Sequence, residues 1–187
     1  MEEDVKKACD TLSKGGIVLY PTDTIWGIGC DATSQEAVKK VYEIKQRIDS
    51  KSMLVLLDST AKLDYYVSDC PEIALDLIEI SDKPLTIIYS GAKNLAPNLI
   101  AEDGSIGIRI TQEKFSKELC RRFKKPVVST SANISGEANP ANFSEINSAI
   151  INAVDYVVNY RQDDSMSAKP SSIIKLSKGG IIKIIRE

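Results

Sequence analysis

The feature that most constrains this chain is a short apolar strand that gives way abruptly to hydroxyl and carboxylate side chains. Residues 17–20 read Ile-Val-Leu-Tyr and follow two glycines, a pattern typical of a buried strand. Pro21 ends this strand, because proline cannot donate a hydrogen bond to a sheet. Thr22, Asp23 and Thr24 follow directly. Ligands of open α/β sheets collect beyond the carboxyl ends of strands, so we expect a ligand site here.

The same pattern occurs a second time. Residues 126–129 form another apolar strand, and TSANISG follows at 130–136. If the two strands run parallel, both polar runs lie at the same edge of the sheet. A polar turn explains one such run easily but explains two less well. Ser131 and Asn133 therefore join Thr24 as candidate ligand-binding residues.

Two cations end the helix that follows the first polar run. Ser34 or Thr33 is expected to cap this helix, and Lys45 and Arg47 close it. Residues two positions apart do not share a helix face, so both side chains reach one anion only where the chain leaves the helix. The alternative is that both cations simply complement the helix dipole. The spacing leaves both interpretations open.

Arg109 lies in the middle of a predicted strand over residues 106–110, between two isoleucines. Because side chains alternate along a strand, Arg109 points to the face opposite to Ile108 and Ile110. An unpaired guanidinium on a buried face costs several kcal/mol, so this side chain must meet an anion. A bound anion and a structural ion pair both satisfy that requirement.

Apolar periodicity predicts a mixed α/β fold in a single domain, residues 1–187. The continuous apolar run at 53–57 is typical of a strand buried on both faces, so helices should cover both faces of the sheet. The sheet is expected to have about seven strands. The other elements expected are helices at 3–13, 60–80, 113–123 and 143–152, and strands at 84–89, 156–158 and 172–186, the last being a hairpin.

The composition excludes several chemistries. The 187 residues include no histidine, which removes imidazole bases, Ser-His-Asp and Cys-His hydrolysis, and histidine-bound zinc. The four cysteines lack the paired spacing of a zinc or redox site. A net charge of −2 argues against a general basic field for nucleic acid. No apolar run has membrane-spanning length and the N-terminus is too charged for a signal peptide, so we expect a cytoplasmic protein without membrane contact.

Residues 27–32 fit the G-x-G-x-x-A dinucleotide fingerprint, but the first glycine does not follow its strand directly, so a Rossmann site is not predicted. Gly27 and Gly29 are expected instead to allow tight backbone turns and the close approach of a ligand. The remaining candidates are polar side chains at strand ends together with cations. Such groups suit phosphate and carboxylate ligands, because their hydrogen bonds to anions are charge-assisted. The pattern predicts a site for an anionic small molecule, a nucleotide among the candidates. The set is Thr22, Thr24, Lys45, Arg47, Arg109, Ser131, Asn133, Ser171 and Arg186.

Five ordered sequence blocks resemble the YrdC-like threonylcarbamoyl-AMP synthases. PTDTIWGIGCDA at 21–32 leads to a K-x-R element at 45–47, and PLTIIY, SIGIRI, STSANISG and PSSIIKL follow in the family's order over nearly the whole chain. The resemblance implies a twisted α/β sheet curled around a deep positive cavity. It also implies a reaction that joins L-threonine, bicarbonate or CO2, and ATP into threonylcarbamoyl-adenylate, with release of pyrophosphate. A separate complex then uses this product to modify the tRNA adenosine beside the anticodon.

The resemblance also implies roles for individual residues. Lys45 and Arg47 fall on the K-x-R pair that faces the ATP phosphates, and we expect them to act as the catalytic cations. Further residues expected to contact ATP are Lys51, Ser105, Ser131, Asn133, Asn139 and Arg186. Residues expected to contact threonine are Thr24, Arg109, Ser129 and Ser171. Mg2+ is expected to arrive with ATP rather than in a metal site of the protein.

The chain departs from the family pattern at a few positions. Ser52 follows Lys51 where family members often have proline, and Leu56 stands where some members have histidine. Two other functions remain open. One is an RNA-binding module that uses the cavity without chemistry and binds tRNA in a steeply salt-dependent way. The other is a nucleotide-binding paralogue with a different acceptor. A weak contact to tRNA is also a candidate partner interaction of the synthase.

Overall fold

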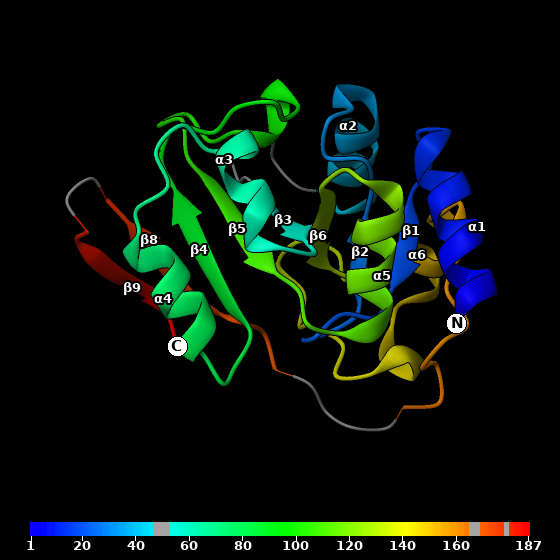
Figure 1. The fold of residues 1–187 in the computed structure, drawn as a ribbon. Helices are drawn as coiled ribbons and strands as arrows, with labels where there is room; N and C mark the ends of the chain where they lie inside the picture. The colour runs from blue at the N-terminus through cyan, green and yellow to red at the C-terminus, as the bar shows by residue number, and fades with distance from the viewer. Residues whose placement is uncertain (47–52, 165–168, 178–179) are drawn as a thin grey trace.

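The computed structural model describes residues 1–46, 53–164, 169–177 and 180–187. The described residues form one mixed sheet of nine strands, in the order β7-β1-β2-β6-β3-β5-β4-β8-β9 (Figure 1). The predicted α/β class is confirmed, although the strand number exceeds the expected seven. The strands are β1 Val18–Tyr20, β2 Gly27–Gly29, β3 Leu54–Leu57, β4 Leu85–Tyr89, β5 Ile106–Ile110, β6 Val127–Ser131, β7 Tyr156–Val157, β8 Ser172–Leu176 and β9 Ile182–Arg186.

The helices pack around this sheet. Helices α1 and α5 lie side by side in front of it in Figure 1, where α5 contacts β3 and α1 contacts β1. Helix α2 begins at Ser34, whose side chain accepts a hydrogen bond from the backbone N–H of Ala37 at 3.3 Å. The helices are α1 Glu2–Ser13, α2 Gln35–Ile44, α3 Leu63–Tyr66, α4 Ile73–Ile80, α5 Lys114–Phe123 and α6 Ser148–Ala153, with 3-10 turns at Thr60–Lys62, Pro97–Leu99 and Phe143–Glu145.

Two long helices expected from the sequence are each divided in the structure. The segment expected to be helical at 60–80 contains a 3-10 turn, α3 and α4. The break follows Tyr66, where Val67 forms an isolated bridge to Ala92 and Ser68 donates its backbone N–H to Gly91. The expected helix at 143–152 is likewise a 3-10 turn followed by α6. In the first case, contacts distant in sequence override a continuous helical pattern.

Strand β2 is the element that the sequence did not predict. Gly27 and Gly29 were expected to form a turn, but both are extended and pair with β1 on one side, while Gly27 and Ile28 pair with β6 on the other. A Cβ atom on Gly29 would lie 2.3 Å from the carbonyl oxygen of Val128 and 2.6 Å from the Tyr20 ring. Glycine is therefore required here because neighbouring strands approach closely, not because the backbone turns.

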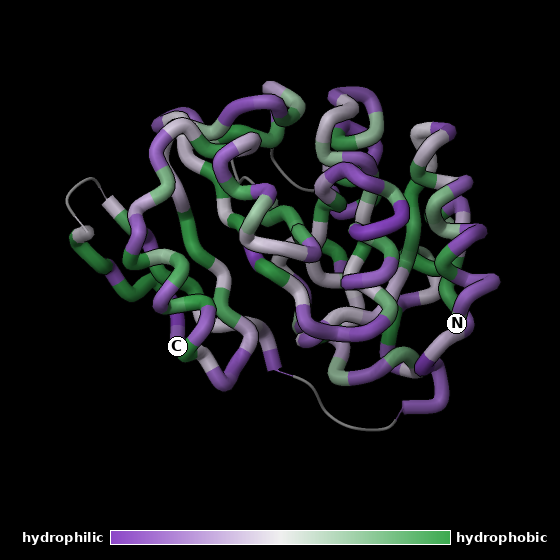
Figure 2. Tube along the Cα trace, viewed as in Figure 1, coloured by the Kyte–Doolittle hydropathy of each residue, from purple (hydrophilic) through white to green (hydrophobic). Residues whose placement is uncertain are grey.

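The strands divide their side chains between two faces. Val55, Ile87, Ile108 and Val128 lie on one face, are paired across the sheet and are at most 2% exposed. Figure 2 shows that hydrophobic residues follow the strands while hydrophilic residues dominate the outer surfaces of the helices. Burial of such apolar side chains is the main favourable term in folding. Arg109 lies on the opposite face, as the alternation predicted.

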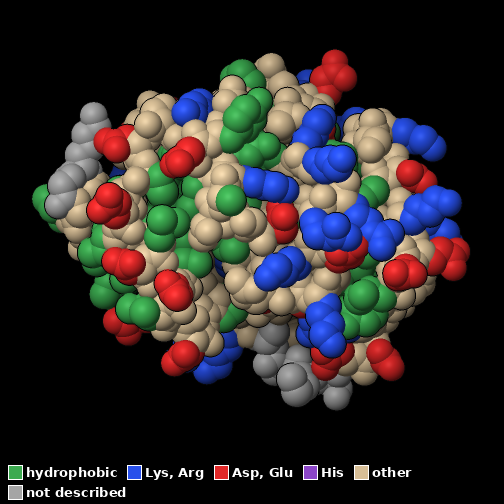
Figure 3. Space-filling view, viewed as in Figure 1, with side chains coloured by type: hydrophobic (Ala, Val, Ile, Leu, Met, Phe, Trp, Pro, Cys, Tyr) green, Lys and Arg blue, Asp and Glu red, His purple; other side chains and the backbone are tan. Residues whose placement is uncertain are grey.

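Charge is distributed unevenly over the surface. Lys and Arg side chains gather around α5, whereas Asp and Glu dominate around α4 (Figure 3). Helix α5 contains Lys114, Lys117, Arg121 and Arg122, while α4 contains Asp76 and Glu79. Positive charge is thus local on this face, in keeping with the small net charge of the chain. In the described part of the chain, no helix combines the length and the apolar character that a membrane span requires.

We predict that Gly29→Ala destabilises the protein by about 3 kcal/mol, because the new methyl group overlaps the Val128 carbonyl and the Tyr20 ring. Gly107→Ala in β5 is the matched control, since its Cβ would meet no atom closer than 3.4 Å. This control is expected to change the free energy of unfolding by less than about 1 kcal/mol. Urea denaturation of both variants measures the difference. Equal stability of the two variants would show that the close approach at Gly29 is not limiting.

Candidate functional site

A cavity of about 280 Å³ lies against one face of the sheet. Its floor is formed by residues two positions apart on three strands. Alternate residues of a strand face the same side of a sheet, so these residues share the face that bounds the cavity. These floor residues are Thr86 and Ile88 of β4, Gly107 and Arg109 of β5, and Ser129 and Ser131 of β6. The predicted ligand site is therefore not confined to an edge of the sheet but extends along the sheet face.

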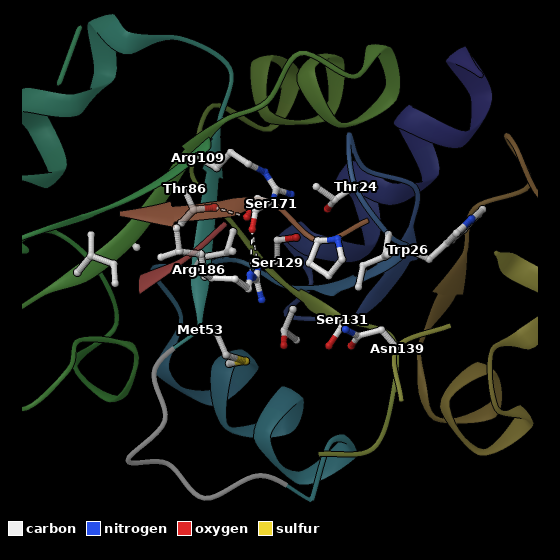
Figure 4. A pocket seen from close by; sticks show the side chains of 18 of the residues that line it. Thr24, Trp26, Met53, Thr86, Arg109, Ser129, Ser131, Asn139, Ser171 and Arg186 are labelled. Carbon is white, nitrogen blue, oxygen red and sulfur yellow. Dashed lines mark hydrogen bonds between the residues drawn. The ribbon is translucent and has the colours of Figure 1, made fainter. Parts of the chain in front are cut away.

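Most of the described site residues come together in this cavity. Figure 4 shows Arg109, Thr86 and Ser171 at one end, and Ser131 with Asn139 at the other. The predicted residues that line the cavity are Thr24, Ser105, Arg109, Ser129, Ser131, Asn139, Ser171 and Arg186. Arg47 and Lys51 lie outside the described residues. Lys45 and Asn133 are buried beside the cavity rather than among the residues that line it.

The two polar runs meet at one edge of the sheet, as predicted for parallel strands, although β1 and β6 are not neighbours. Strand β2 lies between them and is antiparallel to both. Its residue Gly27 pairs with Tyr20 on one side and Ser131 on the other. The ends of β1 and β6 therefore lie at the same level of the sheet. Between them is Gly27, which has no side chain.

Thr22 organises the first polar loop. Its hydroxyl donates to the carbonyl oxygen of Ile25 at 2.8 Å and accepts from the backbone N–H of Thr24 at 3.0 Å. The hydroxyls of Thr22 and Thr24 lie 3.0 Å apart. Since the single proton of Thr22 is committed to Ile25, Thr24 donates to Thr22. The oxygen of Thr24 therefore retains acceptor capacity toward the cavity that it lines.

Arg109 has a carboxylate partner and still has a donor to spare. Its Nη2 lies 3.0 Å from Oδ1 of Asp23, and the Arg109 side chain is 3% exposed. Its Nε has no hydrogen-bond partner among the described residues. Burial lowers the pKa of Arg109, which the charge of Asp23 opposes; burial also raises the pKa of Asp23 despite the nearby guanidinium. The structure therefore contains the ion pair that the sequence suggested for Arg109, and Arg109 still has a donor for a bound anion.

Arg186 brings a second guanidinium to the cavity from β9. Its Nε and Nη2 donate to the backbone carbonyl of Ser171 at 3.0 and 2.8 Å. The hydroxyl of Ser171 lies 2.8 Å from that of Thr86 on β4. Partial burial lowers the pKa of Arg186, so its charge is incompletely solvated. Thr86 was not singled out from the sequence, although its alternation with Ile88 on a predicted strand would have placed it there.

Lys45 connects α2 to the second polar run. Its Nζ donates to the backbone carbonyls of Ser131 and Asn133, the latter at 2.7 Å, and to Oδ1 of Asn133 at 3.2 Å. Ser131 donates its hydroxyl to the same Oδ1 at 2.5 Å, and the Asn133 amide donates to the carbonyl of Glu137. Lys45 and Asn133 therefore form a polar network behind Ser131, the member of this group that lines the cavity.

Ser105 is held by a carboxylate outside the cavity. Its hydroxyl donates to Oδ1 of Asp103 at 2.5 Å, and Lys175 lies 2.6 Å from Oδ2 of the same residue. Lys175 and the Ser105 hydroxyl together lower the pKa of Asp103 to about 2. Asp103 therefore stays ionised and keeps Ser105 in place.

The sequence did not identify Trp26 as a site residue. It lines the cavity beside Gly27, and its ring lies 4.9 Å from that of Phe143. The sequence signal that could have identified Trp26 is its position directly after the first polar loop.

The donor set does not suit a metal held by the protein. The described residues contain no group of three or more His, Cys, Asp or Glu side chains that would bind a metal ion. The residues that line the cavity include two arginines and several hydroxyls but no carboxylate. Hard cations such as Mg2+ prefer oxygen ligands, with carboxylates foremost among protein groups. The cavity as described is built for an anion.

Comparison with known proteins identifies relatives over nearly the full length. Residues 10–187 match the model of the Sua5/YciO/YrdC family, which carries the description telomere recombination. A protein of Pseudoalteromonas translucida named threonylcarbamoyl-AMP synthase is 30% identical over 97% of this chain and 98% of its own length. One of Xanthomonas euvesicatoria with the same name is 30% identical over 96% of this chain and 97% of its own.

A solved structure has the same fold. The crystal structure of P. abyssi Sua5 complexed with L-threonine superposes with a TM-score of 0.88 at 20% identity. The match covers 100% of this chain and 54% of that one, so this chain corresponds to about half of the P. abyssi protein.

We predict that Lys45→Met lowers the free energy of unfolding by about 3 kcal/mol, because it removes a buried ammonium donor that three oxygens of Ser131 and Asn133 share. Lys40→Met in α2 is the matched control, since Lys40 is exposed and its hydrogen bond among the described residues goes to the carbonyl of Gly15. That variant is expected to stay within about 0.5 kcal/mol of the parent protein. Chemical denaturation distinguishes the two. A Lys45→Met protein as stable as Lys40→Met would contradict the structural role of this ammonium group.

Proposed function

Because the chain belongs to the Sua5/YciO/YrdC family, we propose that it is an L-threonylcarbamoyladenylate synthase. It forms threonylcarbamoyl-AMP and pyrophosphate from L-threonine, bicarbonate or CO2, and ATP, within a single YrdC-like domain spanning residues 1–187. A separate complex takes the product to modify tRNA beside the anticodon, in the cytoplasm. The observation that carries the proposal is a cavity whose described lining has no carboxylate and places the arginines Arg109 and Arg186 among small hydroxyl side chains.

Threonine binds at the end of the cavity formed by Thr24, Arg109, Ser129 and Ser171. The free Nε of Arg109 supports this placement, because a buried N–H without an acceptor favours a ligand that supplies one. A carboxylate is the matching ligand, since its hydrogen bonds to guanidinium are charge-assisted. The acceptor capacity of the Thr24 oxygen suits the α-amino group or the hydroxyl of the substrate.

ATP occupies the other end, near Ser131 and Asn139, and extends along the cavity to Ser105 and Arg186. Ser131 is supported from behind by Lys45 and Asn133, so its hydroxyl is fixed before the nucleotide arrives. Lys45 adds positive charge behind Ser131, and we assign Arg47 and Lys51, which lie outside the described residues, to the same nucleotide. Charge-assisted bonds from such groups suit a triphosphate. In Figure 4, Ser131 and Asn139 lie at the opposite end of the cavity from Arg109 and Thr86, whereas Arg186 lies beside Ser171.

The chemistry needs positioning more than a strong base. The α-amino group of threonine captures CO2 to give a carbamate, with loss of a proton to solvent. A carbamate oxygen then attacks the α-phosphorus of ATP, and the bond to the β-phosphate bridging oxygen breaks to release pyrophosphate. The cavity holds the carboxylate of threonine and the phosphates of ATP by fixed cations, so the two reacting groups meet in one orientation. This requirement is compatible with a chain that lacks histidine.

Mg2+ fits this scheme as a companion of ATP. Among the described residues the cavity offers hydroxyls but no carboxylate, so Mg2+ would be held by ATP, with at most a hydroxyl from these residues. When bound, Mg2+ neutralises phosphate charge on the leaving group. The residues of the chain orient the nucleotide that carries it.

We predict that pyrophosphate release from ATP depends on both L-threonine and bicarbonate. Omission of either is expected to lower the rate by about 100-fold or more, because the nucleophile is absent. A coupled pyrophosphate assay with dialysed substrates measures this. Equal release without threonine would overturn the stated reaction and favour a paralogue with a different acceptor. Binding of tRNA that is steeply salt-dependent, without any pyrophosphate release, would instead indicate an RNA-binding module.

We also predict that Arg186→Met raises the KM for ATP about tenfold or more, through the loss of one charge-assisted contact. Lys183→Met on the same strand is the control, since Lys183 is exposed and is not among the residues that line the cavity. Steady-state kinetics with saturating threonine and bicarbonate report the change. An unchanged KM for ATP in Arg186→Met would remove Arg186 from the proposed nucleotide site.

A further inference from the structure

We infer that Asp23 is a positioning residue that holds the guanidinium of Arg109 in place for the carboxylate of threonine. This inference rests on the proposed function and extends it to a residue outside the set that lines the cavity. Asp23 lies between Thr22 and Thr24 in the first polar loop, and Thr24 lines the cavity. Two adjacent residues of one loop thus serve the same site. Thr24 lines the cavity, and Asp23 contacts Arg109, which lines it.

The contact between Asp23 and Arg109 is close and shielded from solvent. Nη2 of Arg109 lies 3.0 Å from Oδ1 of Asp23, and the side chains are 3% and 10% exposed. This is an ion pair and not a hydrogen bond, because Oδ1 of Asp23 has no hydrogen-bond partner among the described residues. Nε of Arg109 has none there either. Opposite charges in such surroundings attract strongly, since little water screens them. Asp23 therefore restricts where the guanidinium can lie.

The contact does not use up the donors of Arg109. A guanidinium has five N–H donors, and the contact with Asp23 is made at Nη2. Nε remains without a partner in the described part of the chain, and Arg109 lines the cavity. A carboxylate of the substrate thus finds a cation that is already fixed and still has a donor available. Preorganisation of this kind reduces the entropy lost on binding.

The loop that carries Asp23 is itself rigidly held. Thr22 bonds to Ile25 and to the backbone of Thr24, so it closes the loop on both sides of Asp23. Arg161 supports the loop from outside, where its Nη1 donates to the carbonyl of Thr22 at 3.3 Å. A carboxylate on a rigid loop restricts the position of the guanidinium that it contacts. A carboxylate on a flexible loop would instead move together with the guanidinium. This is the structural reason to assign positioning to Asp23 and not to Arg109.

Two roles for Asp23 predict opposite effects on substrate binding. If Asp23 only neutralises Arg109, its carboxylate competes with that of threonine, and its removal tightens threonine binding. If Asp23 positions Arg109, its removal lets the guanidinium move and weakens threonine binding. The rigid loop and the unused Nε favour the second effect. The sign of the change therefore decides between the two roles.

The test compares L-threonine binding by calorimetry, and KM and kcat by pyrophosphate release, in the parent protein, Asp23→Asn, Arg109→Met and the double variant. We expect Asp23→Asn to weaken threonine binding about tenfold and to raise the KM for threonine in parallel, with the KM for ATP within about twofold of the parent value. In the Arg109→Met background, Asp23→Asn is expected to have no further effect. Tighter or unchanged threonine binding in Asp23→Asn would overturn the inference, as would an equal additional loss in the double variant.

Asp4→Asn is the matched control for loss of a buried carboxylate. Asp4 accepts hydrogen bonds from Tyr156 and Asn159 and is not among the residues that line the cavity. It is expected to lower stability without a change in threonine affinity. A threonine effect in Asp4→Asn equal to that in Asp23→Asn would show that general loosening of the fold is responsible.

Asp23→Glu keeps the test decisive if Asp23→Asn fails to fold. It retains the charge but moves the carboxylate by one methylene, so threonine binding is expected to weaken while ATP binding is unchanged. Parent-like threonine affinity in Asp23→Glu would contradict positioning. Threonine binding by the parent protein distinguishes failure of the proposed function from failure of the inference on Asp23. If the parent protein binds no threonine, the proposed function and the inference both fail, whereas binding that is insensitive to Asp23 removes the inference alone.

Discussion

A full positive charge in the middle of a sheet is the constraint on which this arrangement depends. Arg109 is almost wholly buried, and its cross-strand neighbour on β3, Leu56, is fully buried and offers no polar group. The counter-charge comes from Asp23, in the loop after β1. Strands β2, β6 and β3 lie between β1 and β5 in the sheet. One ion pair therefore joins two parts of the sheet that are separated by three strands, one of which, β6, belongs to the cavity floor.

Local sequence rules were sufficient for much of this architecture. Alternation along strands placed Arg109 opposite to Ile108, and it extends to Thr86 and Ser129 on the neighbouring strands. Proline at position 21 marked the end of β1, and a capping serine marked the start of α2. The ordered blocks that resemble a known family supplied the expected cavity and most of the residues that line it. These features depend on neighbours in the sequence or on period-two patterns.

What sequence reasoning missed depends on contacts between distant segments. The glycines of β2 suggested a turn, because the close approach of Val128 and Tyr20 to Gly29 cannot be read from adjacent residues. The spacing around Lys45 left its role open between a bound anion and the helix dipole. Its described hydrogen bonds go to oxygens of Ser131 and Asn133, far along the chain. Glycine and lysine are chemically versatile, so tertiary surroundings decide which of their uses applies.

The cavity draws on residues from nearly the whole chain, from Thr24 in the first polar loop to Arg186 on β9. Contacts of such long sequence separation form late, because each must overcome a large loss of chain entropy. The cavity is complete only once the hairpin of β8 and β9 has joined β4. A substrate that binds only the completed cavity shifts the folding equilibrium, by about 2.7 kcal/mol at 100 times its Kd. For any ligand of the completed cavity, the ligand concentration and the folded fraction of the chain are in this way coupled.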